Sequence, residues 1–323
     1  MGTALVTGGA GFIGSHLVER LLTDGMSVCV VDDLSTGAVR NLDAVRSHPQ
    51  LHLYLDDIQK GPLLTELVDR ADVVYHLAAA VGVKLIVEDP VRTIETNIHG
   101  TEMVLERCAR KRKTVLLAST SEVYGKGQNE KFSEEHDLVF GATTKGRWSY
   151  GCSKAIDEFL ALAYHRSRGL PVVVARFFNI VGPRQVGHYG MVVPRFVQQA
   201  LQGGPITVYG DGQQVRCFMH VRDLMDAVLA LMGTEKAIGQ IFNVGSDQPV
   251  TIEELARRVQ ELVNPAAEIV HIPYDEAYAK GFEDIRYRVP DVTKLRQTVR
   301  FQPRYDLDRI LLDVRDYIAA QGS

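Results

Sequence analysis

Residues Ala4–Leu17 read ALVTGGAGFIGSHL, and this stretch decides the fold of the 323-residue chain. Residues 4–7 are a short apolar run that predicts a strand, and Gly8, Gly11 and Gly14 follow at three-residue spacing where a helix is expected to begin. A strand, a glycine turn and a helix in this order let the backbone approach a pyrophosphate closely, and the helix N-terminus favours the anion. The stretch therefore predicts a dinucleotide-binding unit.

The next expected strand, residues 27–31, ends at an acid, Asp32. A carboxylate at this point accepts hydrogen bonds from the ribose hydroxyls of adenosine and repels a 2′-phosphate. We therefore predict that the cofactor is NAD rather than NADP. The remaining alternative is a glycine-rich loop in another kind of α/β protein.

Apolar runs and helix-period segments alternate through the first half of the chain. The runs that predict further strands are residues 51–55, 73–77, 115–118 and 172–176. This alternation predicts an α/β fold of the Rossmann type, a doubly wound parallel sheet with helices on both faces. We assign residues 1–180 to this NAD-binding domain.

The pattern changes after residue 180, where glycines and prolines mark a long irregular region. Expected helices follow at residues 192–201, 221–233, 251–263 and 306–320, with strands at 206–209 and 239–244. We assign residues 181–323 to a smaller C-terminal α/β substrate lobe, interleaved with segments that return to complete the sheet.

Composition excludes several classes of function. The net charge is −4, and no basic cluster is interleaved with aromatic residues, so we expect no nucleic-acid partner. No apolar run reaches the length of a membrane span, and a strand starting at residue 4 leaves no room for a signal peptide. The four cysteines show no metal-ligand spacing, which predicts no metal site and the reduced thiols of a cytoplasmic protein.

Tyr150 and Lys154 stand four residues apart at the start of an expected helix and therefore share one of its faces. A lysine ammonium beside a phenol is expected to lower the pKa of the phenol, which suits Tyr150 to take a proton from a hydroxyl. Ser119 and Thr120 follow the strand at 115–118, at the sheet edge where cofactors bind, so a hydroxyl there can share this proton. Taken alone, the Tyr–Lys spacing is also common in surface pairs.

Together these residues resemble the extended short-chain dehydrogenase/reductase family, whose members modify nucleotide sugars as epimerases, dehydratases and decarboxylases. In the first half, the resemblance rests on the glycine motif, Asp32, Asp57–Ile58, His76–Ala79, Ser119–Thr120 and the Tyr150/Lys154 pair. In the second half, it rests on Arg176–Asn179, Gly182–Arg184, Val208–Gly212, Arg216, His220–Asp223 and Phe242–Gly245.

The resemblance implies roles for individual residues. Thr120, Tyr150 and Lys154 would move the proton and support hydride transfer. The implied NAD-binding residues are Gly8, Gly11, Phe12, Ile13, Gly14, Asp32, Asp57, Ile58, Leu77, Ala78, Ala79, Asn97 and Lys154. The implied substrate-binding residues are Ser121, Arg147, Asn179, Arg184, Val193, Tyr209, Arg216 and Arg288. The substrate would be a UDP-sugar, whose diphosphate the guanidinium of Arg216 can grip through paired hydrogen bonds.

Three residues favour one reaction. Dehydratases of the family carry an adjacent Asp-Glu pair where this chain has Ser121-Glu122, so their acid is missing. Glu122, Arg147 and Arg288 instead resemble UDP-glucuronate decarboxylases. A 4-keto uronate is a β-keto acid that can lose CO₂, arginines can stabilise the enolate and a glutamate can relay protons. The main prediction is an NAD-dependent decarboxylase that forms UDP-xylose, with Glu122 as a fourth catalytic residue.

Two alternatives stay open. Val83 and Ile86 stand where those decarboxylases usually have a proline and a tyrosine, so the sugar pocket is expected to be altered. A 4-epimerase that acts on a UDP-hexose or UDP-hexuronate is the first alternative, and a non-catalytic NAD-sensing protein on the same fold is the second. The resemblance also implies a homodimer, with contacts from residues 93–110 and 155–165.

Overall fold

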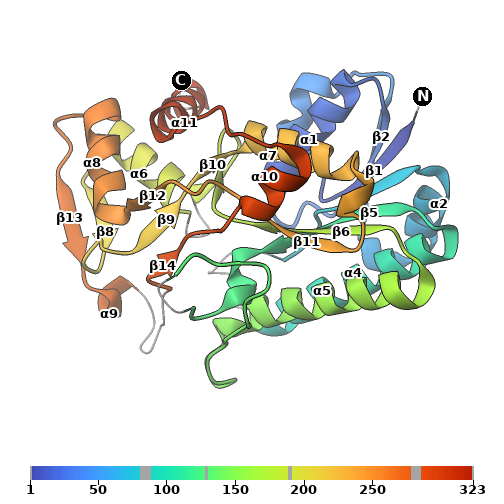
Figure 1. Cartoon of the computed structure of the whole chain (residues 1–323). Helices are drawn as coiled ribbons and strands as arrows, with labels where there is room; N and C mark the ends of the chain where they lie inside the picture. Colours follow the sequence, from blue (N-terminus) through green and yellow to red (C-terminus); the bar gives the residue numbers. More distant parts are fainter. Residues whose placement is uncertain (1, 81–88, 128–129, 188–190, 278–284, 322–323) are drawn as a thin grey trace.

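The computed structural model describes residues 2–80, 89–127, 130–187, 191–277 and 285–321. A larger lobe contains the N-terminus and the central sheet, and a smaller lobe contains α6, α8 and α11 (Figure 1). The sheet has seven strands in the order β11-β6-β5-β4-β1-β2-β3, and neighbouring strands pair in parallel. This topology confirms the expected doubly wound α/β fold.

The strands of this sheet lie close to the ranges expected from the sequence. They are β1 (Thr3–Thr7), β2 (Ser27–Asp32), β3 (Leu51–Leu55), β4 (Val73–His76), β5 (Thr114–Thr120), β6 (Val172–Phe177) and β11 (Gln240–Val244). A parallel strand is covered on both faces, so it is apolar throughout. In β1, Ala4 and Val6 belong to the core on one face and Leu5 to the core on the other.

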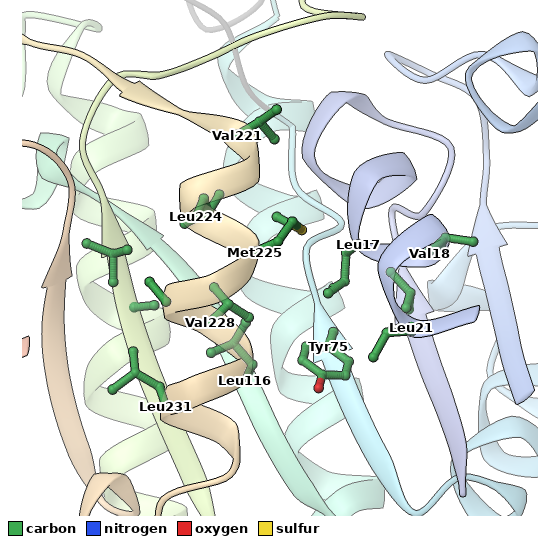
Figure 2. Close-up of a cluster of buried hydrophobic side chains, with 14 of the residues drawn as sticks. Leu17, Val18, Leu21, Tyr75, Leu116, Val221, Leu224, Met225, Val228 and Leu231 are labelled. Atoms are coloured by element: carbon green, nitrogen blue, oxygen red, sulfur yellow. The ribbon is translucent and has the colours of Figure 1, made fainter. Parts of the chain in front are cut away.

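Helices cover both faces of the sheet. On one face lie α1 (Phe12–Thr23), α7 (Val221–Met232) and α10 (Thr293–Val299), and on the other lie α2 (Pro62–Arg70), α4 (Pro90–Lys111) and α5 (Trp148–Arg168). Figure 2 shows Leu17 of α1 and Val228 of α7 beside Tyr75 and Leu116 of the sheet. The sheet edge at the carboxyl ends of the strands is thereby left for the site.

The smaller lobe has its own core, formed by α6 (Val192–Leu201), β8 (Ile206–Tyr209), α8 (Ile252–Val263) and α11 (Leu307–Gln321). Its remaining elements are β13 (Ile269–Ile272), α9 (Tyr274–Ala277) and a three-stranded sheet of β12 (Pro249–Thr251), β9 (Val215–Cys217) and β14 (Tyr287–Arg288). Two more short strands, β7 (Ile180–Val181) and β10 (Met219–His220), pair with each other in parallel. Strand β7 follows β6 of the first sheet, and β10 directly precedes α7. These short strands were not predicted.

Short 3₁₀ turns complete the first lobe, and the one that matters for the site is η3 (Ser121–Tyr124), directly after β5. Strand β11 lies beyond residue 181 and yet pairs with β6, so the chain returns to the first sheet as expected. The boundary at residue 180 stays a prediction. Among the described residues, no helix has the length and apolar character needed to cross a membrane, and no cluster of His, Cys, Asp or Glu could hold a metal.

Candidate active site

A cavity of about 490 Å³ lies at the carboxyl ends of the parallel strands and extends to the smaller lobe. Most of the residues predicted for cofactor and substrate line it. They are Gly8, Gly11, Phe12, Ile13, Gly14, Asp32, Asp57, Ile58, Leu77, Ala78, Ala79, Thr120, Ser121, Glu122, Arg147, Tyr150, Lys154, Asn179, Val193, Tyr209, Arg216 and Arg288. Residues from both halves of the sequence therefore share one site.

The glycine turn between β1 and α1 has no room for side chains. A Cβ atom on Gly14 would lie 2.1 Å from the carbonyl oxygen of Gly8, and one on Gly8, which has φ +72°, would lie 2.8 Å from the Ala78 nitrogen. Such a turn exposes backbone N–H groups at the start of a helix. The residues present therefore fit a dinucleotide pyrophosphate.

Asp32 lies at the end of β2, where it contacts both the cavity and the glycine turn. Its Oδ2 accepts a hydrogen bond from the Ala10 nitrogen and its Oδ1 accepts one from the Leu34 nitrogen, each at 2.8 Å. Burial raises the pKa of Asp32, and the two N–H donors oppose that rise. The carboxylate is thus held in place by the backbone of the two loops that flank it.

Two predicted site residues lie away from the cavity lining. Asn97 accepts a hydrogen bond from the Ala80 nitrogen at 2.8 Å and donates one to Ser153 Oγ at 3.2 Å, so it holds Ala80, four residues after β4, against α5. Arg184 donates to Ser15 Oγ at 3.2 Å and pairs with Glu19 on α1. Its charge is therefore satisfied by the first helix, outside the set of residues that line the cavity.

Lys154 is paired with an acid that the motif does not include. Its Nζ donates to Oδ2 of Asp157 at 2.7 Å, and the two side chains are 2% and 0% exposed. Burial raises the pKa of Tyr150, the Glu122 carboxylate raises it further, and the hydrogen-bonded Thr120 hydroxyl opposes both. The lower pKa expected for this phenol is therefore not found, because burial is the main cause of the rise, and the Lys154 ammonium is paired with Asp157.

Glu122 lies on η3 between two arginines. Its Oε2 is 3.0 Å from Arg147 Nη1 and its Oε1 is 2.7 Å from Arg288 Nη2. Burial pushes the pKa of Glu122 up, but the charges of Arg288 and Arg147 outweigh burial, so the pKa is lowered. Arg147 stands at the N-terminus of α5, where the helix dipole disfavours a cation, and the carboxylate compensates for this.

The two arginines of the smaller lobe are neighbours across a strand pair. Arg288 of β14 and Arg216 of β9 are register partners, and both line the cavity. Within the described part of the chain, Nε of Arg288 is buried without a hydrogen-bond partner. Together with Arg147, these arginines surround the Glu122 carboxylate with positive charge at this end of the cavity, which suits an anionic substrate.

The family described as GDP-mannose 4,6 dehydratase matches residues 5–314 of this chain. The chain belongs to that family. A UDP-N-acetyl-α-D-glucosaminuronate decarboxylase from Bacillus cytotoxicus is 45% identical over 93% of this chain and 92% of its own length. UDP-glucuronic acid decarboxylase 1 from Arabidopsis thaliana is 38% identical over 97% of this chain and 70% of its own length.

Solved structures of similar enzymes share the fold of this GDP-mannose 4,6 dehydratase family member. UDP-glucuronic acid 4-epimerase from Bacillus cereus, solved with UDP-glucuronic acid and NAD, superposes with a TM-score of 0.89 at 28% identity. The match covers 99% of each chain. The resemblance to NAD-dependent epimerases, dehydratases and decarboxylases is therefore confirmed.

Sequence reasoning missed several residues that line the cavity of this family member. The polar ones include Ser35, Thr36, Gln185, Arg195, Gln214 and Tyr274. Gln214 Nε2 donates to the Tyr274 hydroxyl at 2.5 Å, and the Arg195 guanidinium lies 4.0 Å from the centre of the Tyr209 ring. Only Gln214 had a local signal, since it follows the glycine turn before Arg216. Val83 and Ile86 lie outside the described residues, so the altered sugar pocket stays a prediction.

Proposed function

We propose that this protein is an NAD-dependent UDP-glucuronate decarboxylase that forms UDP-xylose through a 4-keto intermediate. The observation that carries the proposal is the Glu122 carboxylate between Arg147 and Arg288, in the same cavity as Tyr150. Two relatives that align over most of this chain are decarboxylases of UDP-hexuronates by name, which supports it.

The glycine turn and Asp32 are the residues that would hold NAD, the turn at its pyrophosphate and Asp32 at the adenosine ribose. When bound, NAD would supply a hydride acceptor for C4 of the sugar and the hydride that is later returned, and its positive charge would favour a phenolate nearby. The reaction therefore has no net redox change.

Tyr150 is the base for the first step. As a phenolate it takes the proton of the C4 hydroxyl, while Thr120 holds the phenol oxygen through its own hydroxyl. The Lys154 ammonium, fixed one turn further along α5, offers positive charge close to the phenolate. In the last step, Tyr150 returns the proton to the C4 oxygen.

The arginines and Glu122 serve the second step. The C5–C6 bond breaks, CO₂ leaves, and the electron pair enters the C4 carbonyl as an enolate that a guanidinium can stabilise. A substrate carboxylate that binds Arg288 draws this charge away from Glu122, and burial then raises the pKa of Glu122. Glu122 can thereby take up and deliver the proton that C5 needs.

The test is product analysis with purified protein, NAD and UDP-glucuronate, and with UDP-N-acetylglucosaminuronate in parallel because of the Bacillus cytotoxicus relative. Mass spectrometry and NMR are expected to show loss of CO₂ and a UDP-pentose. Relative kcat/KM for the two uronates then measures the preference at C2. No CO₂ release from either substrate would refute the decarboxylase.

A 4-epimerase is the second candidate, favoured by the superposition on the Bacillus cereus UDP-glucuronic acid 4-epimerase. It predicts a product of unchanged mass with inverted C4. The two activities are distinguished in the same assay, because only decarboxylation removes the carboxylate that faces Arg288.

The proposal includes a homodimer in the cytoplasm. Large apolar side chains are exposed on α4 and α5, among them Phe159 at 66%, Val91 at 63% and Ile156 at 47%. Pairing of these helices with those of a second copy would cover the patch. Light scattering is expected to give twice the chain mass, and Phe159→Glu is expected to give the single-chain mass.

A further inference from the structure

Asn243 is a buried amide at the point where two segments of the site meet. We propose that it is a positioning residue, one that sets the alignment of Glu122 with Arg288 and thereby serves the decarboxylation step. Asn243 lies on β11 and is 0% exposed. This inference rests on the proposed function and assigns a role to the Phe242–Gly245 motif, which the site itself does not use.

The side-chain oxygen of Asn243 connects it to the turn that carries Glu122. Tyr124, at the other end of η3, donates its hydroxyl proton to Asn243 Oδ1 at 2.7 Å. Its ring stacks on Phe132 at 4.5 Å with an interplanar angle of 1°, and the Arg176 guanidinium lies 4.6 Å from the ring centre. A single 3₁₀ turn held at its last residue fixes the direction in which Glu122 projects.

The side-chain nitrogen of Asn243 connects it to the segment that follows Arg288. Asn243 Nδ2 donates to the carbonyl oxygens of Asp291, at 3.1 Å, and Phe132, at 2.8 Å. Phe132 itself pairs through its backbone with Val289 and Asp291, each at 2.8 Å. The segment that follows Arg288 is therefore fastened to the same amide as the turn that carries Glu122.

Asn243 is well suited to this position because its side chain both accepts and donates. Its amide nitrogen donates to Asp291 in the Arg288 segment and to Phe132, which pairs with that segment, and its oxygen accepts from Tyr124 of the Glu122 turn. One planar amide group therefore joins the two. Tyr150 and Lys154 are placed by α5 instead. Disturbing Asn243 should therefore impair the step that needs Glu122 and Arg288 more than the oxidation at C4.

Tyr124→Phe removes the hydrogen bond from Tyr124 to Asn243 and keeps the ring stack on Phe132. Asn243→Ala removes this bond and also the two bonds to Phe132 and Asp291. Each holoenzyme is mixed with UDP-glucuronate, and NADH absorbance and CO₂ release are followed in a single turnover. In Tyr124→Phe we expect CO₂ release to fall by roughly tenfold and C4 oxidation to change by less than about twofold. The reason is that a small displacement of Glu122 slows only the step in which Glu122 acts. NADH and the 4-keto sugar would then accumulate.

Val228→Ala, in the core between α7 and the sheet, is the matched control for a general loss of stability. It is expected to change both rates alike. Equal losses in both steps of Tyr124→Phe, or no loss in either, would overturn the role of Asn243 while the wild type still releases CO₂. If Asn243→Ala does not fold, Tyr124→Phe decides alone. A wild type that releases no CO₂ would refute the proposed function together with this inference.

Discussion

Glu122 Oε1 and Arg288 Nη2 form an ion pair at 2.7 Å, although one lies directly after β5 and the other on β14 of the second lobe. The pair brings an ionised carboxylate to the place where the substrate carboxylate would bind. Two carboxylates that compete for one guanidinium give the site a means to change the protonation of Glu122 when substrate arrives.

Replacing Glu122 with Gln tests this role. The amide keeps the size of the side chain but can neither carry the charge nor deliver the proton, so we expect CO₂ release to fall by about 10²-fold. C4 oxidation should persist, because Tyr150 does not need Glu122 for it and Glu122 raises the pKa of Tyr150. Single-turnover NADH absorbance and CO₂ capture measure the two steps. Glu253→Gln, on α8, is the control, and unchanged CO₂ release in Glu122→Gln would contradict the assignment.

Gly151 packs against the carbonyl of Glu122. A Cβ atom at this position would lie 2.6 Å from the Glu122 oxygen and 2.9 Å from the Phe140 ring. We expect Gly151→Ala to push η3 away and to reduce CO₂ release by about 10-fold or more, since catalysis is sensitive to such shifts. Gly146→Ala, where a Cβ meets nothing within 4 Å, is the control in the same assay. Equal activity of the two variants would show that η3 tolerates the displacement.

The sequence predicted those elements whose pattern is local. Residues 51–55 and 192–201 form β3 and α6 as expected, because each contains enough residues to show its period. The two- and three-residue strands were missed because they are defined by distant partners. Val215, for example, pairs with both Thr251 and Tyr287.

The site residues also fall into those that a local motif predicts and those that depend on distant neighbours. Motif positions such as Glu122 and Arg147 could be predicted because the resemblance supplies them, and the structure brings them together. Charge balance could not be predicted, because it depends on neighbours in space. Burial raises the pKa of Tyr150, which Lys154 was expected to lower, and Arg184 pairs with Glu19 outside the cavity lining.

The Lys154–Asp157 pair gives a stability prediction. Asp157→Asn leaves a buried ammonium without its carboxylate, and breaking a buried ion pair typically costs ~3–5 kcal/mol. We expect urea unfolding to show a loss of this order. The double variant Lys154→Met/Asp157→Asn should regain part of it, because no lone charge remains. Additive losses in the double variant would show that the two side chains do not depend on each other.

His76 gives a pH prediction. Burial, reinforced by the Lys154 charge, lowers the pKa of His76 from 6.5 to about 3, so the folded protein holds it neutral while the unfolded chain protonates it. Below pH 6.5 the unfolded state therefore binds the extra proton. As the pH falls from 7, the free energy of unfolding should therefore decrease, with a slope from this residue alone that approaches ~1.4 kcal/mol per pH unit once the pH is well below 6.5.

Urea unfolding between pH 7 and pH 5 measures that slope, and His76→Gln removes its contribution. The variant loses contacts with Thr7 and Thr101, so its stability is lower at every pH, but the slope is the quantity compared. His16 and His220, whose pKa values burial lowers to about 4 and about 3, contribute to the remaining slope. Identical slopes for wild type and His76→Gln would contradict the prediction.

Asp32 holds the backbone of Ala10 and Leu34 by two hydrogen bonds of 2.8 Å. The loops that would hold the nucleotide therefore take their shape as the chain folds. Binding does not have to supply the free energy needed to order them. Tight retention suits a reaction that restores its own oxidant within each cycle, because the dinucleotide never has to leave. In that respect the dinucleotide behaves as a built-in part of the catalyst and not as a second substrate, and only the UDP-sugar and the released CO₂ must enter or leave the site.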